Sequence, residues 1–179
     1  MERELEVKLL GIDVKKFEDK LISLGAKLIA REYQKNTTIN STFHPIDNNR
    51  GYLRIRNTKN LLNDEDKFYF TFKEQITNKG IRENLEHTIT FDDEIELLNI
   101  LKCLDYDIYD IGYKNRVSYL YKNVRFDIDS WDENTYPYPY IEVEVDDKYK
   151  LDEILKELEV DSKAISTMSI AELKNSLKK

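Results

Sequence analysis

Three charged residues near the start of the chain, Glu4, Glu6 and Lys8, have types and spacing that suit metal and phosphate chemistry. On a β-strand they project to one face, while the apolar residues between them project to the other. Carboxylates are preferred ligands of hard divalent cations, and an ammonium group attracts phosphoryl oxygens. The triplet alone is more often simply a solvated strand face, so the other strands must decide between the two interpretations.

Alternation with a period of two recurs along the chain and predicts further strands, each with an apolar face and a charged face. Arg54 and Arg56, for example, share a face that excludes Leu53 and Ile55. The acidic members of these faces are Glu4, Glu6, Glu86, Asp127, Asp129, Glu142 and Glu144. The basic members are Lys8, Arg54, Arg56, Lys73, Arg82, Lys114, Arg116 and Arg125.

Helical patterns interrupt the strands at residues 13–28, 93–104, 150–158 and 169–177, which predicts an α+β fold. Asp and Glu are poor strand formers, so their abundance on these strands argues against faces that are merely solvated. We therefore predict an antiparallel, eight-stranded, closed or nearly closed β-barrel with a charged interior and helices packed outside. Its acidic and basic side chains nearly balance, which suits a triphosphate bound with two divalent cations.

Length, composition and charge limit the function classes. A chain of 179 residues without a Gly-, Pro- or Ser-rich linker is expected to form one domain, residues 1–179. A net charge of −7 and a pI near 5.0 argue against nucleic-acid binding. We find no apolar stretch suited to a membrane span, and the charged first residues lack a signal segment, so we expect a cytoplasmic protein. The pattern leaves monomer and homodimer open.

Several motifs, in order along the chain, together resemble the CYTH superfamily of triphosphate tunnel metalloenzymes. Glu4-Leu5-Glu6-Val7-Lys8 matches the Glu-x-Glu-x-Lys signature of that family, and Leu53-Arg54-Ile55-Arg56 matches its Leu-Arg-Ile-Arg strand. The further matches are Lys73, Arg82 with Glu86, Lys114 with Arg116, Asp129, Glu142 with Glu144, and a late element at Ser162-Lys163-Ala164. The resemblance covers nearly the whole chain, although Asn84 stands where an acidic residue is common.

The resemblance implies a role for each matching residue. It places Mg²⁺ or Mn²⁺, in a two-ion arrangement, on Glu4, Glu6, Asp129, Glu142 and Glu144. It implies contacts with the phosphates from Lys8, Arg54, Arg56, Lys73, Arg82, Lys114, Arg116, Arg125 and Lys163. Glu6, Asp129 and Lys8 are the residues expected to take part directly in catalysis.

Three functions fit this site. The first is metal-dependent hydrolysis of inorganic triphosphate or of a small organic triphosphate such as thiamine triphosphate. The second is a class IV-type adenylate cyclase that converts ATP to cyclic AMP and pyrophosphate, for which the sequence shows no base pocket. The third is a non-catalytic polyphosphate-binding domain, which the complete acidic set disfavours. A small-molecule triphosphate is the expected partner in each case.

Overall fold

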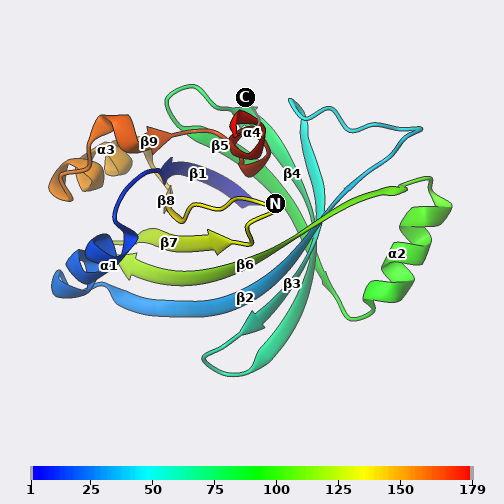
Figure 1. Ribbon diagram of the computed structural model, residues 1–179, viewed down its shortest axis with the longest axis horizontal. Coiled ribbons are helices and arrows are strands. Elements are labelled where there is room, and N and C mark those ends of the chain that lie inside the picture. Colours follow the sequence, from blue (N-terminus) through cyan, green and yellow to red (C-terminus); the bar gives the residue numbers. More distant parts are fainter. Residues whose placement is uncertain (1, 178–179) are drawn as a thin grey trace.

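The fold is built around one antiparallel sheet that closes on itself, shown in Figure 1 for the computed structural model, which describes residues 2–177. The ring contains β1 (Glu2–Leu9), β2 (Lys27–Asn40), β3 (Gly51–Asn60), β4 (Glu65–Thr77), β5 (Arg82–Phe91), β6 (Ile108–Tyr121), β7 (Val124–Trp131) and β8 (Tyr140–Val145). The other elements are the helices α1 (Val14–Ser23), α2 (Glu94–Cys103), α3 (Lys148–Glu157) and α4 (Ile170–Ser176), the 3₁₀ helix η1 (Ser162–Ala164) and the short strand β9 (Ile165–Ser166).

Strand pairing closes the barrel. Neighbouring strands follow the order β5-β4-β3-β2-β6-β7-β8-β1, and antiparallel pairing between β1 and β5 completes the ring. β9 adds to β1 near the end of that strand, where Lys8 lies opposite Ser166. In this ring β3 lies opposite β8, and β2 lies opposite β1. The prediction of a closed eight-stranded antiparallel barrel is confirmed.

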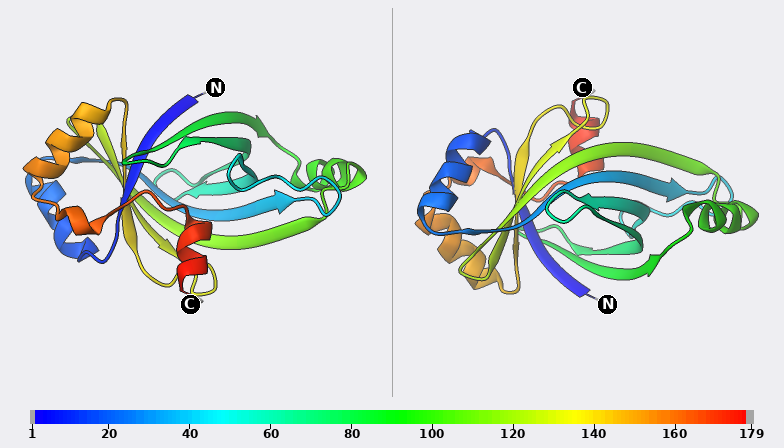
Figure 2. Two further views of the ribbon diagram at one scale, coloured as in Figure 1. Left: turned by 90° about the horizontal axis from the view of Figure 1, so that it is seen from above. Right: turned by 90° about the horizontal axis from the view of Figure 1, so that it is seen from below.

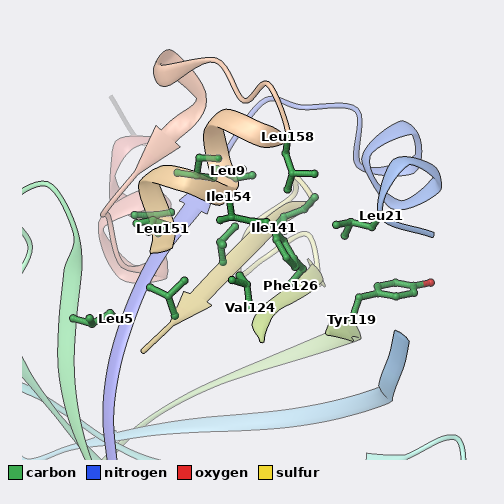
Figure 3. Packing of buried hydrophobic residues seen from close by; sticks show 14 of the residues in the cluster. Leu5, Leu9, Leu21, Tyr119, Val124, Phe126, Ile141, Leu151, Ile154 and Leu158 are labelled. Carbon is green, nitrogen blue, oxygen red and sulfur yellow. The ribbon is translucent and has the colours of Figure 1, made fainter. Parts of the chain in front are cut away.

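The main apolar core lies outside the barrel, between its outer wall and helices α1 and α3. Leu9, Phe126 and Ile141 of the barrel are fully buried and pack with Leu151 and Ile154 of α3 (Figure 3). Each such side chain contributes roughly 1.5–3 kcal/mol when it leaves water. The apolar strand faces therefore serve the core where helices cover them, although Ile89 of β5 and Ile111 of β6 stay exposed on the outside.

Helices cover the two ends of the molecule unequally. α1 and α3 lie together at one end, and α2 lies at the other, as Figure 2 shows. α2 contributes Leu101 to a second core cluster that includes Ile39, Leu53 and Ile55. Among residues 2–177, no helix is both long and apolar enough to cross a membrane.

The predicted helices are all present, with shifted boundaries. α1 ends at Ser23, where Gly25 terminates the helix with a φ of 87°, as a glycine at this place predicts, and residues 27–28 of the helical pattern belong to β2. α3 begins at Lys148, one residue after the N-cap Asp147. β2, a strand of 14 residues, was not among the predicted strands.

Candidate active site

The charged strand faces point into the barrel, as the alternation predicts. All of the seven acidic and eight basic residues assigned to these faces are buried or half-buried. Lys8, Lys114, Arg116, Asp127 and Asp129 are among the most buried of them. A barrel interior of this kind needs internal charge compensation, because an unpaired buried charge is very costly.

In one part of the interior, carboxylates compensate the positive charges, and Arg116 on β6 lies at the centre of that part. Its Nε and Nη2 donate to the two carboxylate oxygens of Asp129, both at 2.7 Å. Its Nη1 lies 2.5 Å from Asp127, and its Nη2 lies 2.5 Å from Glu142. Burial alone would lower the pKa of Arg116, but these carboxylates raise it well above its ordinary value. The guanidinium group therefore fixes three carboxylates and keeps few donors for a ligand.

Two buried lysines complete this part of the interior. Lys8 Nζ lies 3.0 Å from Glu142 Oε1 and 3.8 Å from Glu6 Oε1. Burial opposes the charge on Lys8, yet the two carboxylates leave its pKa raised. Lys114 Nζ donates to Asp129 Oδ2 at 2.8 Å, while burial and a neighbouring arginine lower the pKa of Lys114 to about 8. Both ammonium groups are positioned by carboxylates that are themselves candidate metal ligands.

Lys73 links the opening triplet to β5. Its Nζ lies 2.5 Å from Glu4 Oε2, 3.0 Å from Glu86 Oε1 and 3.7 Å from Glu6 Oε2. Glu86 also lies 3.7 Å from Arg54 Nη2. The structure thus brings Glu86, which the sequence left without a firm role, into the charged interior.

Arg56 on β3 is in a different situation. Its Nε donates to Asn36 Oδ1 at 3.1 Å, and within residues 2–177 it forms no ion pair with a carboxylate. Burial, Arg54 and Arg116 lower the pKa of Arg56 to about 10. In the described residues, the buried Asn36 Nδ2 and Arg54 Nε also lack any hydrogen-bond partner. Unpaired donors are therefore concentrated on β2 and β3.

The carboxylates on the opposite wall carry an excess of negative charge. Glu144 on β8 lies across from Glu6 on β1 in the strand register. Burial raises the pKa of the Glu144 carboxyl to about 7, and repulsion from Glu4, Asp127 and Glu6 adds to this effect. A bound cation would relieve the repulsion among these carboxylates.

The predicted metal set is only partly assembled. Within residues 2–177, no three carboxylates are gathered closely enough to hold one ion in their present orientations, because lysine and arginine side chains hold most of them. The donor chemistry nevertheless fits a hard divalent cation, since Glu4, Glu6 and Glu144 supply carboxylate oxygens on the paired strands β1 and β8. Asp129 and Glu142 of the predicted set are held instead by Arg116.

Two predicted phosphate-binding residues lie at the margin of the site. Lys163 is exposed on η1, where Asp161 caps the turn by accepting from the Lys163 backbone N–H. The structure therefore does not bring the Lys163 side chain into the barrel, and its resemblance-based assignment has no support from its position. Arg125 is half-buried, and its Nε donates to Asp127 Oδ1 at 2.8 Å.

Arg82 faces the C-terminal segment as well as the interior. Its Nη1 donates to the Thr167 carbonyl oxygen at 3.2 Å and lies 3.4 Å from Glu172 of α4. Its Nη2 donates to Gln75 Oε1 at 2.7 Å, and its Nε lies 3.6 Å from Glu6. The side chain is buried, so α4 and the segment before it hold this arginine beside the carboxylates.

Sequence reasoning missed three inward-facing residues. Gln34 and Asn36 on β2 are almost fully buried inside the barrel, and their shared parity is a signal that could have identified them. Tyr140 on β8 is also fully buried, accepts a hydrogen bond from Trp131 Nε1 at 2.8 Å and has Lys8 Nζ at 5.8 Å from its ring centre. All three are uncharged, so a pattern of charged strand faces does not include them.

Comparison with known proteins identifies the family. The model of the CYTH domain matches residues 2–169, which is nearly all of the chain. The chain belongs to the CYTH domain family. Among curated proteins, none matches the sequence significantly. Family membership accounts for the fold of this CYTH domain, while its own substrate must be inferred from the site.

Solved structures with the same fold share little sequence with this CYTH domain. The PH1012 protein of Pyrococcus horikoshii OT3 is 20% identical with a TM-score of 0.78, and the match covers 95% of this chain and 98% of that one. The PH1819 protein of the same organism is 21% identical with a TM-score of 0.77, covering 97% and 99%. HpAC1 from Hippeastrum, a proposed adenylyl cyclase with a dominant triphosphatase activity, is 14% identical with a TM-score of 0.68, covering 98% and 96%.

Proposed function

We propose that this CYTH domain is a metal-dependent triphosphatase that hydrolyses inorganic triphosphate or a small organic triphosphate such as thiamine triphosphate. The observation that carries the proposal is the division of the barrel interior into two opposite walls. β3 carries Arg54, whose Nε lacks a partner within residues 2–177, and Arg56, which forms no ion pair there, and it lies across the ring from β8, with Glu142 and Glu144. A triphosphate bound between the two walls would contact divalent cations on the acidic wall and arginines on the basic wall. It would thereby compensate the charge of both walls.

The acidic wall supplies the metal site in this proposal. Glu4, Glu6 and Glu144 would hold Mg²⁺ or Mn²⁺, and Asp129 and Glu142 would complete a site for two ions. The bound ions would neutralise phosphate charge and lower the pKa of water. Because Glu6 lies within 3.8 Å of the ammonium groups of both Lys8 and Lys73, its orientation is already restricted before any ion binds.

The basic residues bind and orient the substrate. Arg54 and Arg56 hold phosphoryl oxygens through the guanidinium donors that no carboxylate occupies. A water molecule attacks the terminal phosphorus, the bond to the bridging oxygen breaks, and a proton of the water is released to solvent. The products are orthophosphate and diphosphate, or orthophosphate and the organic diphosphate. Lys8 and Lys73 stabilise the charge that accumulates on the phosphoryl oxygens during this step. We place the reaction in the cytoplasm.

A turnover assay tests the proposal. The purified full chain is incubated with Mg²⁺ or Mn²⁺ and with triphosphate, thiamine triphosphate or ATP, and orthophosphate, pyrophosphate and cyclic AMP are resolved. We expect orthophosphate as the main product and no turnover after treatment with EDTA. Cyclic AMP and pyrophosphate from ATP would establish the cyclase instead. Tight binding of triphosphate without turnover would establish a non-catalytic binding domain.

A further inference from the structure

Asn36 carries one of the two buried donor atoms that lack a partner within residues 2–177. It is 4% exposed, projects inward from β2 and lies opposite Arg56 of β3 in the strand register. Its Oδ1 accepts a hydrogen bond from Arg56 Nε, so its Nδ2 is the part of the amide that remains to donate to another group. Within residues 2–177, this buried Nδ2 has no hydrogen-bond partner.

The neighbourhood of Asn36 Nδ2 identifies the ligand chemistry. Buried amide donors in folded proteins are nearly always paired, so an unpaired one at this depth calls for an acceptor from outside the chain. Arg54 Nε, on the same wall, is another buried donor without a partner among the described residues. Donors grouped in this way, with the Nη groups of Arg56 beside them, match an oxygen-rich anion.

We propose that Asn36 is a substrate-binding and positioning residue whose Oδ1 orients the Arg56 guanidinium group while its Nδ2 donates to a phosphoryl oxygen. This inference rests on the proposed function, because it takes a triphosphate as the ligand. An amide suits the position for an electrostatic reason. A third cation beside Arg54 and Arg56 would increase the repulsion between buried charges, whereas an amide adds a donor without adding charge.

The first test measures binding of inorganic triphosphate in EDTA by calorimetry, so that only contacts with the chain contribute. Asn36→Ala should weaken binding about tenfold, since it removes one hydrogen bond to a charged group. Asn36→Asp should weaken binding about 100-fold or more, because its carboxylate pairs with Arg56 and repels the ligand. Asn115, exposed on the outer face of β6, is the matched control, and its Ala and Asp variants should bind within about twofold of wild type.

Outcomes of this test separate the inference from the proposed function. If the wild type neither binds nor hydrolyses triphosphate, the proposed function fails, and the role of Asn36 fails with it. If the wild type binds but Asn36→Ala binds equally well, only the role of Asn36 is wrong, and water satisfies its amide. Should Asn36→Ala not fold, as judged by thermal unfolding, Asn36→Ser provides the same measurement with a smaller change in polarity.

A double-mutant cycle then distinguishes direct donation from orientation of Arg56. If Asn36 donates to the ligand, Asn36→Ala should weaken binding further in an Arg56→Ala background. If Asn36 acted only by orienting Arg56, the double variant would bind as Arg56→Ala does, which would overturn the binding half of the proposal. Unchanged binding together with a lower unfolding temperature would indicate a purely structural residue and overturn both halves.

Discussion

Arg116 and Arg56 are two arginines inside the same barrel with opposite surroundings. Arg116 contacts Asp127, Asp129 and Glu142, all at 2.7 Å or less. Arg56 has one neutral hydrogen-bond partner and no ion pair among the described residues. The chain satisfies the charge of the first arginine and leaves that of the second available. We infer that the first serves the fold and the second serves a ligand.

The comparison extends to the walls that carry these residues. Around β6, β7 and β8 the positive groups are matched by carboxylates, whereas on β2 and β3 three buried polar atoms, Gln34 Oε1, Asn36 Nδ2 and Arg54 Nε, lack partners in residues 2–177. Removing one member of a satisfied buried ion network strands the opposite charges, whereas removing Arg56 strands no charge and leaves only Asn36 Oδ1 without its donor. Stability and binding should therefore respond to different residues.

The largest effect is expected from Arg116→Met. This change leaves three carboxylates close together without their common cation, so the free energy of unfolding should fall by about 3–5 kcal/mol. Urea denaturation followed by circular dichroism measures it. Arg125→Met is the control, because the 37% exposed Arg125 contacts only one of these carboxylates and should cost about 1 kcal/mol or less. Equal losses of unfolding free energy for the two variants would contradict the inference that Arg116 serves the fold through its three carboxylates.

Arg56→Ala should have the reverse effect. We expect turnover of triphosphate to fall by at least about 100-fold, because a main charge-stabilising group is lost. The free energy of unfolding should remain unchanged or increase, since the variant removes a buried cation that no carboxylate compensates. Steady-state kinetics and urea denaturation of the same preparation test both parts. A destabilisation as large as that of Arg116→Met would show that Arg56 also serves the fold.

Glu6→Gln tests the wall opposite Asn36 and β2. It keeps the shape of the side chain and removes the charge expected at the metal site, so turnover should fall by at least about 100-fold. Glu83→Gln is the matched control, because Glu83 pairs with Arg3 at the surface, and its turnover should match wild type. Added Mn²⁺ should bind more weakly to Glu6→Gln than to wild type in calorimetry. Near-wild-type turnover and metal binding would exclude Glu6 as a ligand.

The sequence predicted one property of this site well, namely which face is charged on every barrel strand except β2. Parity along β1 or β3 is local, so Glu6 and Arg54 could be assigned to the interior before the barrel was known. The partners of each charge are not local. Arg116 meets Asp129 and Glu142 because β6, β7 and β8 are consecutive in the ring, and no pattern within one strand reveals that order.

Other residues show why charge patterns and family motifs did not predict the whole site. Gln34 and Asn36 were not predicted because they are neutral, although their buried amides need hydrogen-bond partners, as buried charged groups do. Lys163 was assigned by resemblance alone, and the turn capped by Asp161 leaves it exposed. The contact between Arg82 and Glu172 depends on where α4 packs after the barrel has formed.

The smallest predicted effect is thermal, and it separates ligand binding from general charge screening. At about ten times its dissociation constant, inorganic triphosphate should stabilise the wild type by about 1.4 kcal/mol, which raises the unfolding temperature by about 3–6 °C. Arg56→Ala should show no comparable rise at the same concentration, because its site for the anion is lost. Sodium chloride at matched ionic strength is the control, since screening weakens every exposed charge pair alike. If the salt stabilised the wild type as much as triphosphate does, the rise in unfolding temperature would reflect ionic strength alone. The inference that Arg56 serves a ligand while Arg116 serves the fold would then fail.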